Sequence, residues 1–191
     1  MSIVLVGSTS GSITLQEPAV AGSTVLDLPA TSGTILTTGS SGQSIPKAAL
    51  PTGSVLQVVN ATYNTQTSSS SSTYADTGLT ASITPLYSSS KILVIASVNG
   101  IEKAGSNTQN AVAIKLVRNS TDLANTTRYI GYNNSTTGDG SASSVISYLD
   151  SPATTSSTTY KVQFASEANA ATVYVQSTSS VSSITLMEIA A

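Results

Sequence analysis

The sequence predicts an all-β protein, an antiparallel β-sandwich preceded by an extended N-terminal arm. Of the 191 residues, 36 are serine and 28 are threonine, and Val, Ile and Leu recur among them at every second position in short runs. This alternation is typical of strands with one buried face, and no segment sustains the 3.6-residue period of an amphipathic helix. The hydrophobic fraction of 39% is sufficient for a packed core. We therefore predict an arm over residues 1–39, a linker over 40–53 and a sandwich domain over 54–191.

The arm is predicted from an eleven-residue repeat near the start of the sequence. Gly11, Gly22 and Gly33 are spaced by eleven residues, and Pro18 and Pro29 occupy matching offsets. Proline ends an extended segment because it has no amide N–H to donate, and glycine permits the turn beside it. A repeat this short, in so few copies, cannot bury its own apolar face, so we expect an arm that orders against another chain rather than a floppy tail. Its contact residues would be Ile13, Leu15, Val25, Leu26, Leu28, Ile35 and Leu36.

The linker and the first strands follow from composition and alternation. Glycine and serine over residues 39–44 predict a flexible linker, and the proline-bounded residues 45–51 predict a connector with one helical turn. A strand is expected over residues 54–63. The alternation of apolar and hydroxyl residues over 79–84 predicts another strand, which has one buried face.

The segment 91–98 is a nearly continuous apolar run, which predicts a central strand covered on both faces. Asn99 and Gly100 follow at once and predict a hairpin turn, because both residues tolerate a positive φ. Roughly eight to ten short strands separated by turns indicate an antiparallel sandwich. The remaining strands are expected at residues 111–118, near Tyr129, and at 144–149, 159–165, 172–176 and 183–189.

The parity of side chains along these strands also predicts which are buried. Tyr160 and Phe164 share one face of their strand, and we expect both in the core. Glu188 has the parity of the apolar positions beside it, so we expect it to point inward. A buried carboxylate needs a partner, for which Arg118 or Lys115 is the expected choice.

The composition argues against an enzyme. Histidine and cysteine are absent, which excludes the usual nucleophile–base pairs and most transition-metal sites. Ser88 and Lys91 match the S-x-x-K spacing, but that motif needs a helical turn and here it opens a strand. A pair of carboxylates brought together in space, as in a glycosidase, remains the alternative. We predict no catalytic residue and no cofactor.

Other ligands are equally disfavoured by the sequence. Residues 133–140 offer oxygen atoms for Ca²⁺ but lack the alternating acidic pattern of a dedicated loop, so a long polar loop is expected and no metal site. The seven basic residues are scattered and form no stripe that could follow a phosphate backbone, so we predict no nucleic-acid binding. No stretch approaches the roughly 18 to 20 apolar residues of a membrane-spanning helix. We also find no secretory signal, so we expect synthesis in the cytoplasm.

Four segments resemble a family of bacteriophage virion proteins. They are Gly11–Gly39, which contains LPATSGTILTTG, Tyr74–Thr80 with Ile83–Pro85, Ser88–Val94 and Ile184–Ile189. The first is similar to a segment of phage fibre and decoration proteins, and the others are similar to their C-terminal domains. Those domains resemble trimeric jelly rolls of the complement C1q/tumour-necrosis-factor kind. The resemblance covers nearly the whole chain and implies a jelly-roll fold, a homotrimer and a place on the virion.

Two functions follow from this resemblance. The first is a viral structural protein of the capsid surface, a decoration or cement protein with trimeric knobs whose arm binds the major capsid protein or other virion proteins. Tyr174 and Met187 are candidate trimer contacts. The alternative is a tail-fibre or receptor-binding protein that contacts a glycan of the host surface. Its exposed loop contacts would be Asn107, Asn133, Asn134 and Asp139.

Overall fold

A computed structural model describes two units of the chain, Met1–Ser44 and Ile45–Ala191. In the first unit, strands β1 (Ile3–Val6) and β2 (Ser12–Leu15) pair antiparallel, with Leu5 opposite Ile13. The described residues are 3–6, 12–15, 47–105, 110–125, 128–133, 136, 141–167 and 171–191. The expected arm contacts Val25, Leu26, Leu28, Ile35 and Leu36 lie outside them.

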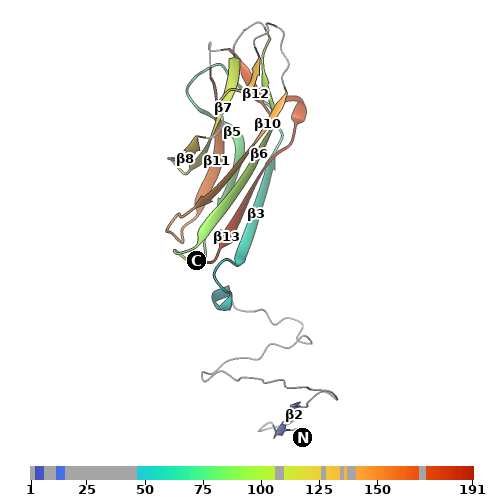
Figure 1. Cartoon of the computed structure of the whole chain (residues 1–191), viewed down its shortest axis with the longest axis vertical. Helices are drawn as coiled ribbons and strands as arrows, with labels where there is room; N and C mark the ends of the chain where they lie inside the picture. The colour runs from blue at the N-terminus through green and yellow to red at the C-terminus, as the bar shows by residue number, and fades with distance from the viewer. Residues whose placement is uncertain are drawn as a thin grey trace. The chain divides into compact units, whose positions relative to one another are not determined.

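The second unit is a sandwich of two sheets (Figure 1). The first sheet has the order β3-β13-β6, and β10 pairs with the other side of β6. Near its end β6 also pairs with β12, which in turn pairs with β4. The strands are β3 (Val55–Tyr63), β4 (Thr67–Ser69), β6 (Lys91–Lys103), β10 (Ala142–Asp150), β12 (Val173–Val175) and β13 (Ser182–Ile189).

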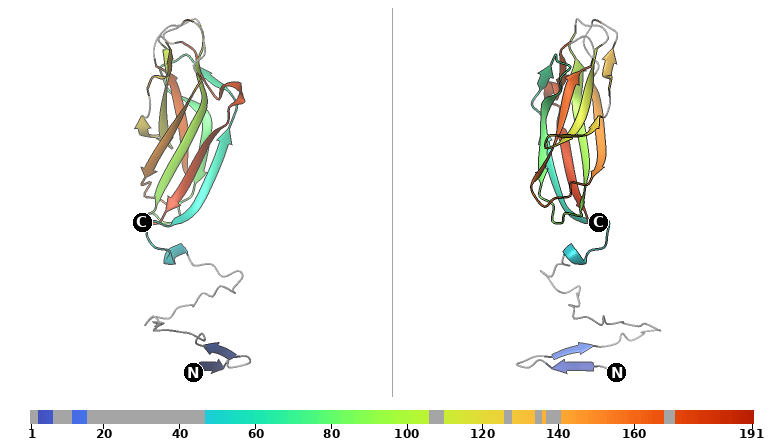
Figure 2. Two further views of the ribbon diagram at one scale, coloured as in Figure 1. Left: turned by 45° about the vertical axis from the view of Figure 1, so that its right-hand side comes forward. Right: turned by 90° about the vertical axis from the view of Figure 1, so that its left-hand side faces the viewer.

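The second sheet has the order β5-β11-β7-β8, and β9 also pairs with β7. Its strands are β5 (Ala75–Ile83), β7 (Asn110–Arg118), β8 (Thr121–Asn125), β9 (Ile130–Asn133) and β11 (Thr158–Ser166). Every pairing among the described strands is antiparallel, and long strands of both sheets run along the sandwich (Figure 2). Successive long strands alternate between the sheets, which is the arrangement of a jelly roll. The predicted antiparallel jelly-roll sandwich is confirmed.

The core lies between the two sheets and consists of every second side chain of the long strands. On β6 the inward residues Ile92, Val94 and Ala96 are fully buried. Tyr160 and Phe164 of β11 are fully buried as well, which confirms their predicted place in the core. Full burial of one large apolar side chain contributes about 1.5–3 kcal/mol.

Most predicted strands are present with shifted ends, and the expected helical turn is the 3₁₀ helix Lys47–Ala49. The short strands β4 and β8 were not predicted. The predicted hairpin at Asn99 and Gly100 is wrong, because both residues lie inside β6. Gly100 has φ +61, and the register between β10 and β6 shifts at this point.

The irregularity at Gly100 is a β-bulge that changes the parity of β6. Before it, the even-numbered residues point inward, whereas beyond it Ile101 and Lys103 are buried and Glu102 is half-buried. A Cβ atom on Gly100 would lie 2.6 Å from the backbone nitrogen of Ser177, so only glycine fits here. The dipeptide therefore predicted a positive φ correctly, at Gly100, but in the structure this conformation forms a bulge within a strand and not a hairpin turn.

Candidate functional site

The candidate site is the outer face of the first sheet, the side turned away from the core. Strand register places its side chains in rows across four strands. One row runs Leu149, Leu93, Met187, Val58 across β10, β6, β13 and β3, and the next runs Ser147, Ile95, Thr185, Asn60. Val145, Ser97, Ser183 and Thr62 form the third row.

The three rows of this outer face contain no charged side chain, and half of their twelve side chains are apolar. Val145 is 63% exposed, Val58 57%, Leu149 51% and Ile95 37%. The remaining side chains of the three rows are hydroxyl, amide or apolar groups, and Lys91 lies beyond them at the start of β6. Large apolar side chains exposed together on one uncharged sheet face are typical of an interaction surface.

The exposure of Ile95 corrects one sequence expectation. The run 91–98 predicted a strand covered on both faces, but within one chain only the inner face of β6 is covered. Val58, Val145 and Leu149 were not singled out as functional residues. The run 91–98 could have indicated this outer face, because apolar residues on both faces of a strand imply that something must cover the second face as well.

The two candidate trimer contacts both lie in the first sheet. Met187 is half-buried in the first row of the outer face, between Leu93 and Val58. Tyr174 is half-buried on β12, opposite Glu102 beyond the bulge, and so does not belong to the three rows. Of the candidate loop residues, Asn133 is the last residue of β9, and Asn107, Asn134 and Asp139 lie outside the described residues.

A buried carboxylate fixes the end of the first sheet. Glu188 Oε2 accepts a hydrogen bond from Gln57 Nε2 at 2.5 Å, and its Oε1 accepts from the backbone N–H groups of Leu86 at 2.8 Å and Tyr87 at 3.4 Å. Burial by itself would raise the pKa of Glu188. The nearby Ser90 hydroxyl, the Gln57 amide and the two backbone amides outweigh this effect and lower the pKa below its usual range.

Glu188 therefore points inward as predicted, but the expected partners were wrong. Arg118 instead pairs with Asp150, at 2.8 Å to both carboxylate oxygens. Tyr160 Oη also donates to Asp150, at 2.6 Å. Lys115 pairs with Asp122 on the neighbouring strand β8, at 2.8 and 2.9 Å.

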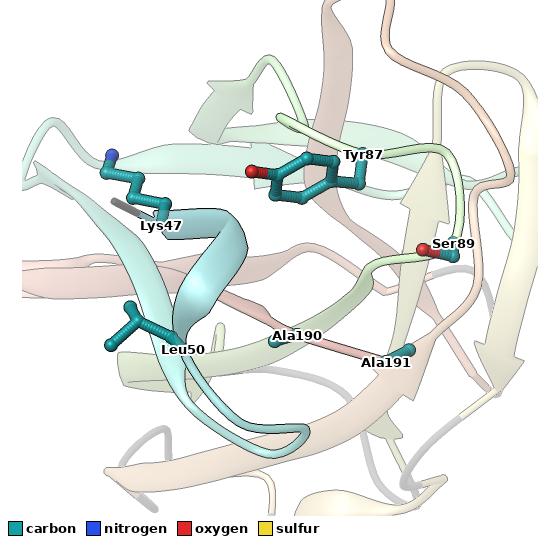
Figure 3. Close-up of a pocket in the computed structure, with 6 residues that line it drawn as sticks. All are labelled: Lys47, Leu50, Tyr87, Ser89, Ala190 and Ala191. Atoms are coloured by element: carbon teal, nitrogen blue, oxygen red, sulfur yellow. The ribbon is translucent and has the colours of Figure 1, made fainter. Parts of the chain in front are cut away.

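A small pocket of about 190 Å³ lies between the end of β13, the loop before β6 and the 3₁₀ helix. Figure 3 shows Lys47 and Leu50 on one side of it and Tyr87 and Ser89 on the other, with Ala190 and Ala191 below. The S-x-x-K serine stands in the turn before β6, so the motif has no helix to align it. Among the described residues, no three His, Cys, Asp or Glu side chains gather as metal ligands would.

Thirteen chains of solved structures match this chain. No protein-family model matches the chain, and no curated protein matches it. The chain is similar to the crystal structure of the infectious bursal disease virus VP2 subviral particle, with 13% sequence identity and a TM-score of 0.36. The match covers 72% of this chain and 34% of that chain, so the chain spans about a third of that protein's length. In the described part of the chain, no helix is long and apolar enough to cross a membrane.

Proposed function

We propose that the chain is a viral structural protein of the capsid surface, a decoration or cement protein. It forms homotrimeric knobs through the outer face of the first sheet, and its N-terminal arm binds the major capsid protein or other virion proteins. The observation that carries the proposal is the uncharged, aliphatic outer face around Ile95. The resemblance of Val25–Gly39 to phage virion proteins supports the viral role.

The outer face suits burial against a second copy because it contains no ion in its three rows. Covering a sheet of hydroxyl, amide and aliphatic side chains strands no charge in an apolar contact. The four large apolar side chains are each about half exposed. At about 1.5–3 kcal/mol for a fully exposed side chain, their burial contributes roughly 3–6 kcal/mol per protomer.

The trimeric state in the proposal rests on the resemblance to trimeric phage domains, and the burial energy of this face separates a closed trimer only from a heterologous dimer. Each association step costs several kcal/mol of translational and rotational freedom, on the order of 4–15 kcal/mol. A closed ring of three forms three contacts while the chains lose freedom in two association steps. A dimer formed by the same heterologous contact gains one contact for one step.

The trimer is tested by placing charge on the outer face. Val145→Lys combined with Leu149→Lys should yield a folded monomer, because both side chains are half exposed or more and make little of the core. Sedimentation equilibrium should give three times 19.2 kDa for the native protein and 19.2 kDa for the variant. Leu86→Lys, at an exposed leucine in the loop after β5, is the matched control and should remain trimeric. A native monomer, or a trimeric double variant, contradicts the proposal.

The arm is tested by deletion of residues 1–40. The shortened protein should remain a folded trimer that no longer binds capsids. Apolar contacts and strand pairing by each arm would be weak alone, and three arms on one knob would bind by avidity. Capsid binding that persists after the deletion would rule out this role for the arm.

The second candidate function is a tail-fibre or receptor-binding protein, because the same sandwich serves both roles. Copy number separates the two. Hundreds of copies on the virion head fit decoration, whereas about a dozen on the tail fit a fibre. Electron microscopy of particles labelled through this chain would place it on one or the other.

A further inference from the structure

Two exposed tyrosines lie on strand β9 and just before it, where neither the core nor the outer face uses them. Tyr129 is 58% exposed and Tyr132 is 49% exposed. Their ring centroids are 6.2 Å apart with an interplanar angle of 78°, an edge-to-face pair. We name them the tyrosine pair. In this geometry the edge of one ring meets the face of the other, so the faces are not lost to mutual stacking.

The backbone is shaped to expose both rings. Tyr129 has φ +62, a region that side-chain-bearing residues rarely adopt, and Gly131 has φ +66. The N–H of Tyr132 donates to the carbonyl oxygen of Tyr129 at 3.3 Å and closes the turn. Ile130, paired with Val112, is buried, and strand alternation would have buried Tyr132 on the same side. The left-handed turn prevents this, and strained backbone of this kind is concentrated at functional sites.

The charged groups around the tyrosine pair are already matched. Arg128, 69% exposed, binds Glu167, whose side chain is 4% exposed, through Nη2 and through Nε at 2.6 Å. Lys115 Nζ lies 4.6 Å from the ring centroid of Tyr74 and pairs with Asp122. Glu167 raises the pKa of Arg128 through its hydrogen bond and its charge, and Arg128 directly precedes Tyr129 in the chain. Among the described residues, both of these cations have a carboxylate partner.

We propose that the tyrosine pair, with Arg128 beside it, binds a neutral oligosaccharide. A pyranose ring presents a face of C–H groups that packs on the electron-rich face of an aromatic ring. Its hydroxyls can pair with the tyrosine hydroxyls and with the guanidinium N–H groups that Glu167 leaves free. Because the cations are paired with carboxylates, an acidic sugar would gain no additional electrostatic attraction over a neutral one. This site goes beyond the proposed assembly role, and it would supply a glycan-binding surface for the second candidate function, the receptor-binding protein.

A protein partner fits these observations less well. A stable protein interface buries on the order of 1,000 Å² or more and has an apolar centre. The tyrosine pair offers two rings bordered by ion pairs, whereas the outer face of the first sheet provides the broad aliphatic surface. The two sites therefore differ in chemistry, and failure of one leaves the other intact.

The test uses the full-length protein on an immobilised panel of neutral and acidic oligosaccharides. Binding should be confined to neutral members. Tyr129→Ala and Tyr132→Ala should each weaken it by about fivefold to tenfold, the worth of one aromatic contact. Tyr129→Phe should retain most of the affinity, because it keeps the ring. Affinity should change little between about 0.05 and 0.5 M salt, since no free charge takes part.

The control is Tyr87→Ala, which removes another exposed tyrosine from the loop before β6 and should leave binding unchanged. Saturation-transfer NMR on the native protein should show bound sugar C–H protons in contact with tyrosine rings, independently of any variant. The proposal is overturned if no oligosaccharide binds, if only acidic ones bind, or if the alanine variants bind as the native protein does. It is also overturned if those variants dissociate the oligomer, because the tyrosines would then be a contact between copies.

Discussion

Glu188→Gln should destabilise the sandwich far more than loss of one surface charge would. The carboxylate is fully buried and accepts two short hydrogen bonds, from Gln57 Nε2 at 2.5 Å and Leu86 N at 2.8 Å. A hydrogen bond to a charged group contributes about 1.5–3 kcal/mol. The side-chain amide of the new glutamine would also point its NH₂ group at one of the two donors, Gln57 Nε2 or Leu86 N, so that two donors would face each other. We expect a loss of about 3–5 kcal/mol in the free energy of unfolding.

The assay is thermal and urea unfolding of both proteins between about pH 3 and pH 7, at one protein concentration because an oligomer's stability depends on it. A loss of 3–5 kcal/mol lowers the midpoint by roughly 6–20 °C in a domain of this size. The folded-state pKa of Glu188 is lowered, so its stabilisation is complete above the unfolded-state pKa of about 4.3 and is lost as pH falls further. The gap between native protein and variant should therefore narrow in acid.

Asp76→Asn is the matched control. This carboxylate also has a lowered pKa, because its hydrogen bonds to Gln163 and Lys161 and the charge of Lys161 outweigh the effect of burial. Its side chain is 55% exposed, so solvent screens the pair and we expect a change of about 0–1 kcal/mol. Equal effects of the two substitutions, or a gap for Glu188 that does not narrow below about pH 4, would refute the reasoning.

The remaining predictions concern two glycines and one core tyrosine. Gly78→Ala places a Cβ 2.3 Å from the Tyr63 ring at φ +87, whereas Gly53→Ala, at φ +90, meets nothing within 4 Å. Urea unfolding should show that Gly78→Ala lowers the free energy of unfolding by about 2–4 kcal/mol and Gly53→Ala by about 1 kcal/mol. Equal losses for the two variants would contradict the steric role of Tyr63. Tyr160→Phe removes the bond to Asp150 and should cost about 1–2 kcal/mol. Burial first, and then the bond to Asp150, raise the pKa of Tyr160, so this tyrosine does not titrate near pH 10 in the folded protein. Tyr160→Phe should therefore leave the tyrosine titration of the folded protein near pH 10 unchanged.

The long strands could be predicted because alternation is a local property. The inward parity of Tyr160, Phe164 and Glu188 follows from it, since one sheet face meets the core along the whole strand. The partners of Glu188 could not be predicted in the same way. Gln57 and Leu86 are 131 and 102 residues away in sequence, and only the packing of β3 and the loop after β5 brings them to it.

The wrong hairpin at Asn99 and Gly100 and the unpredicted outward turn of Tyr132 have one cause. Glycine or asparagine marks a positive φ equally in a hairpin turn, a bulge or a kinked strand. Which of the three forms depends on how the residues after it pair and pack. After Gly100 the strand continues, because β12 pairs with its end and the backbone of Ser177 packs against the glycine. At Gly131 the same freedom turns Tyr132 outward, and glycine within an alternating run was the available hint.

The pairing of β3 with β13 also determines when, during protein synthesis, the first sheet can be completed. In the described residues β3 pairs with β13 alone, and the first row of the outer face joins Val58 to Met187. Ribosomes add about 5–20 residues per second, so the roughly 120 residues between these strands take on the order of 6–24 s to make. Until β13 emerges, the outer face does not exist in its folded form. Nascent chains on one messenger therefore cannot associate through it, and each chain completes this face only when β13 joins the sheet.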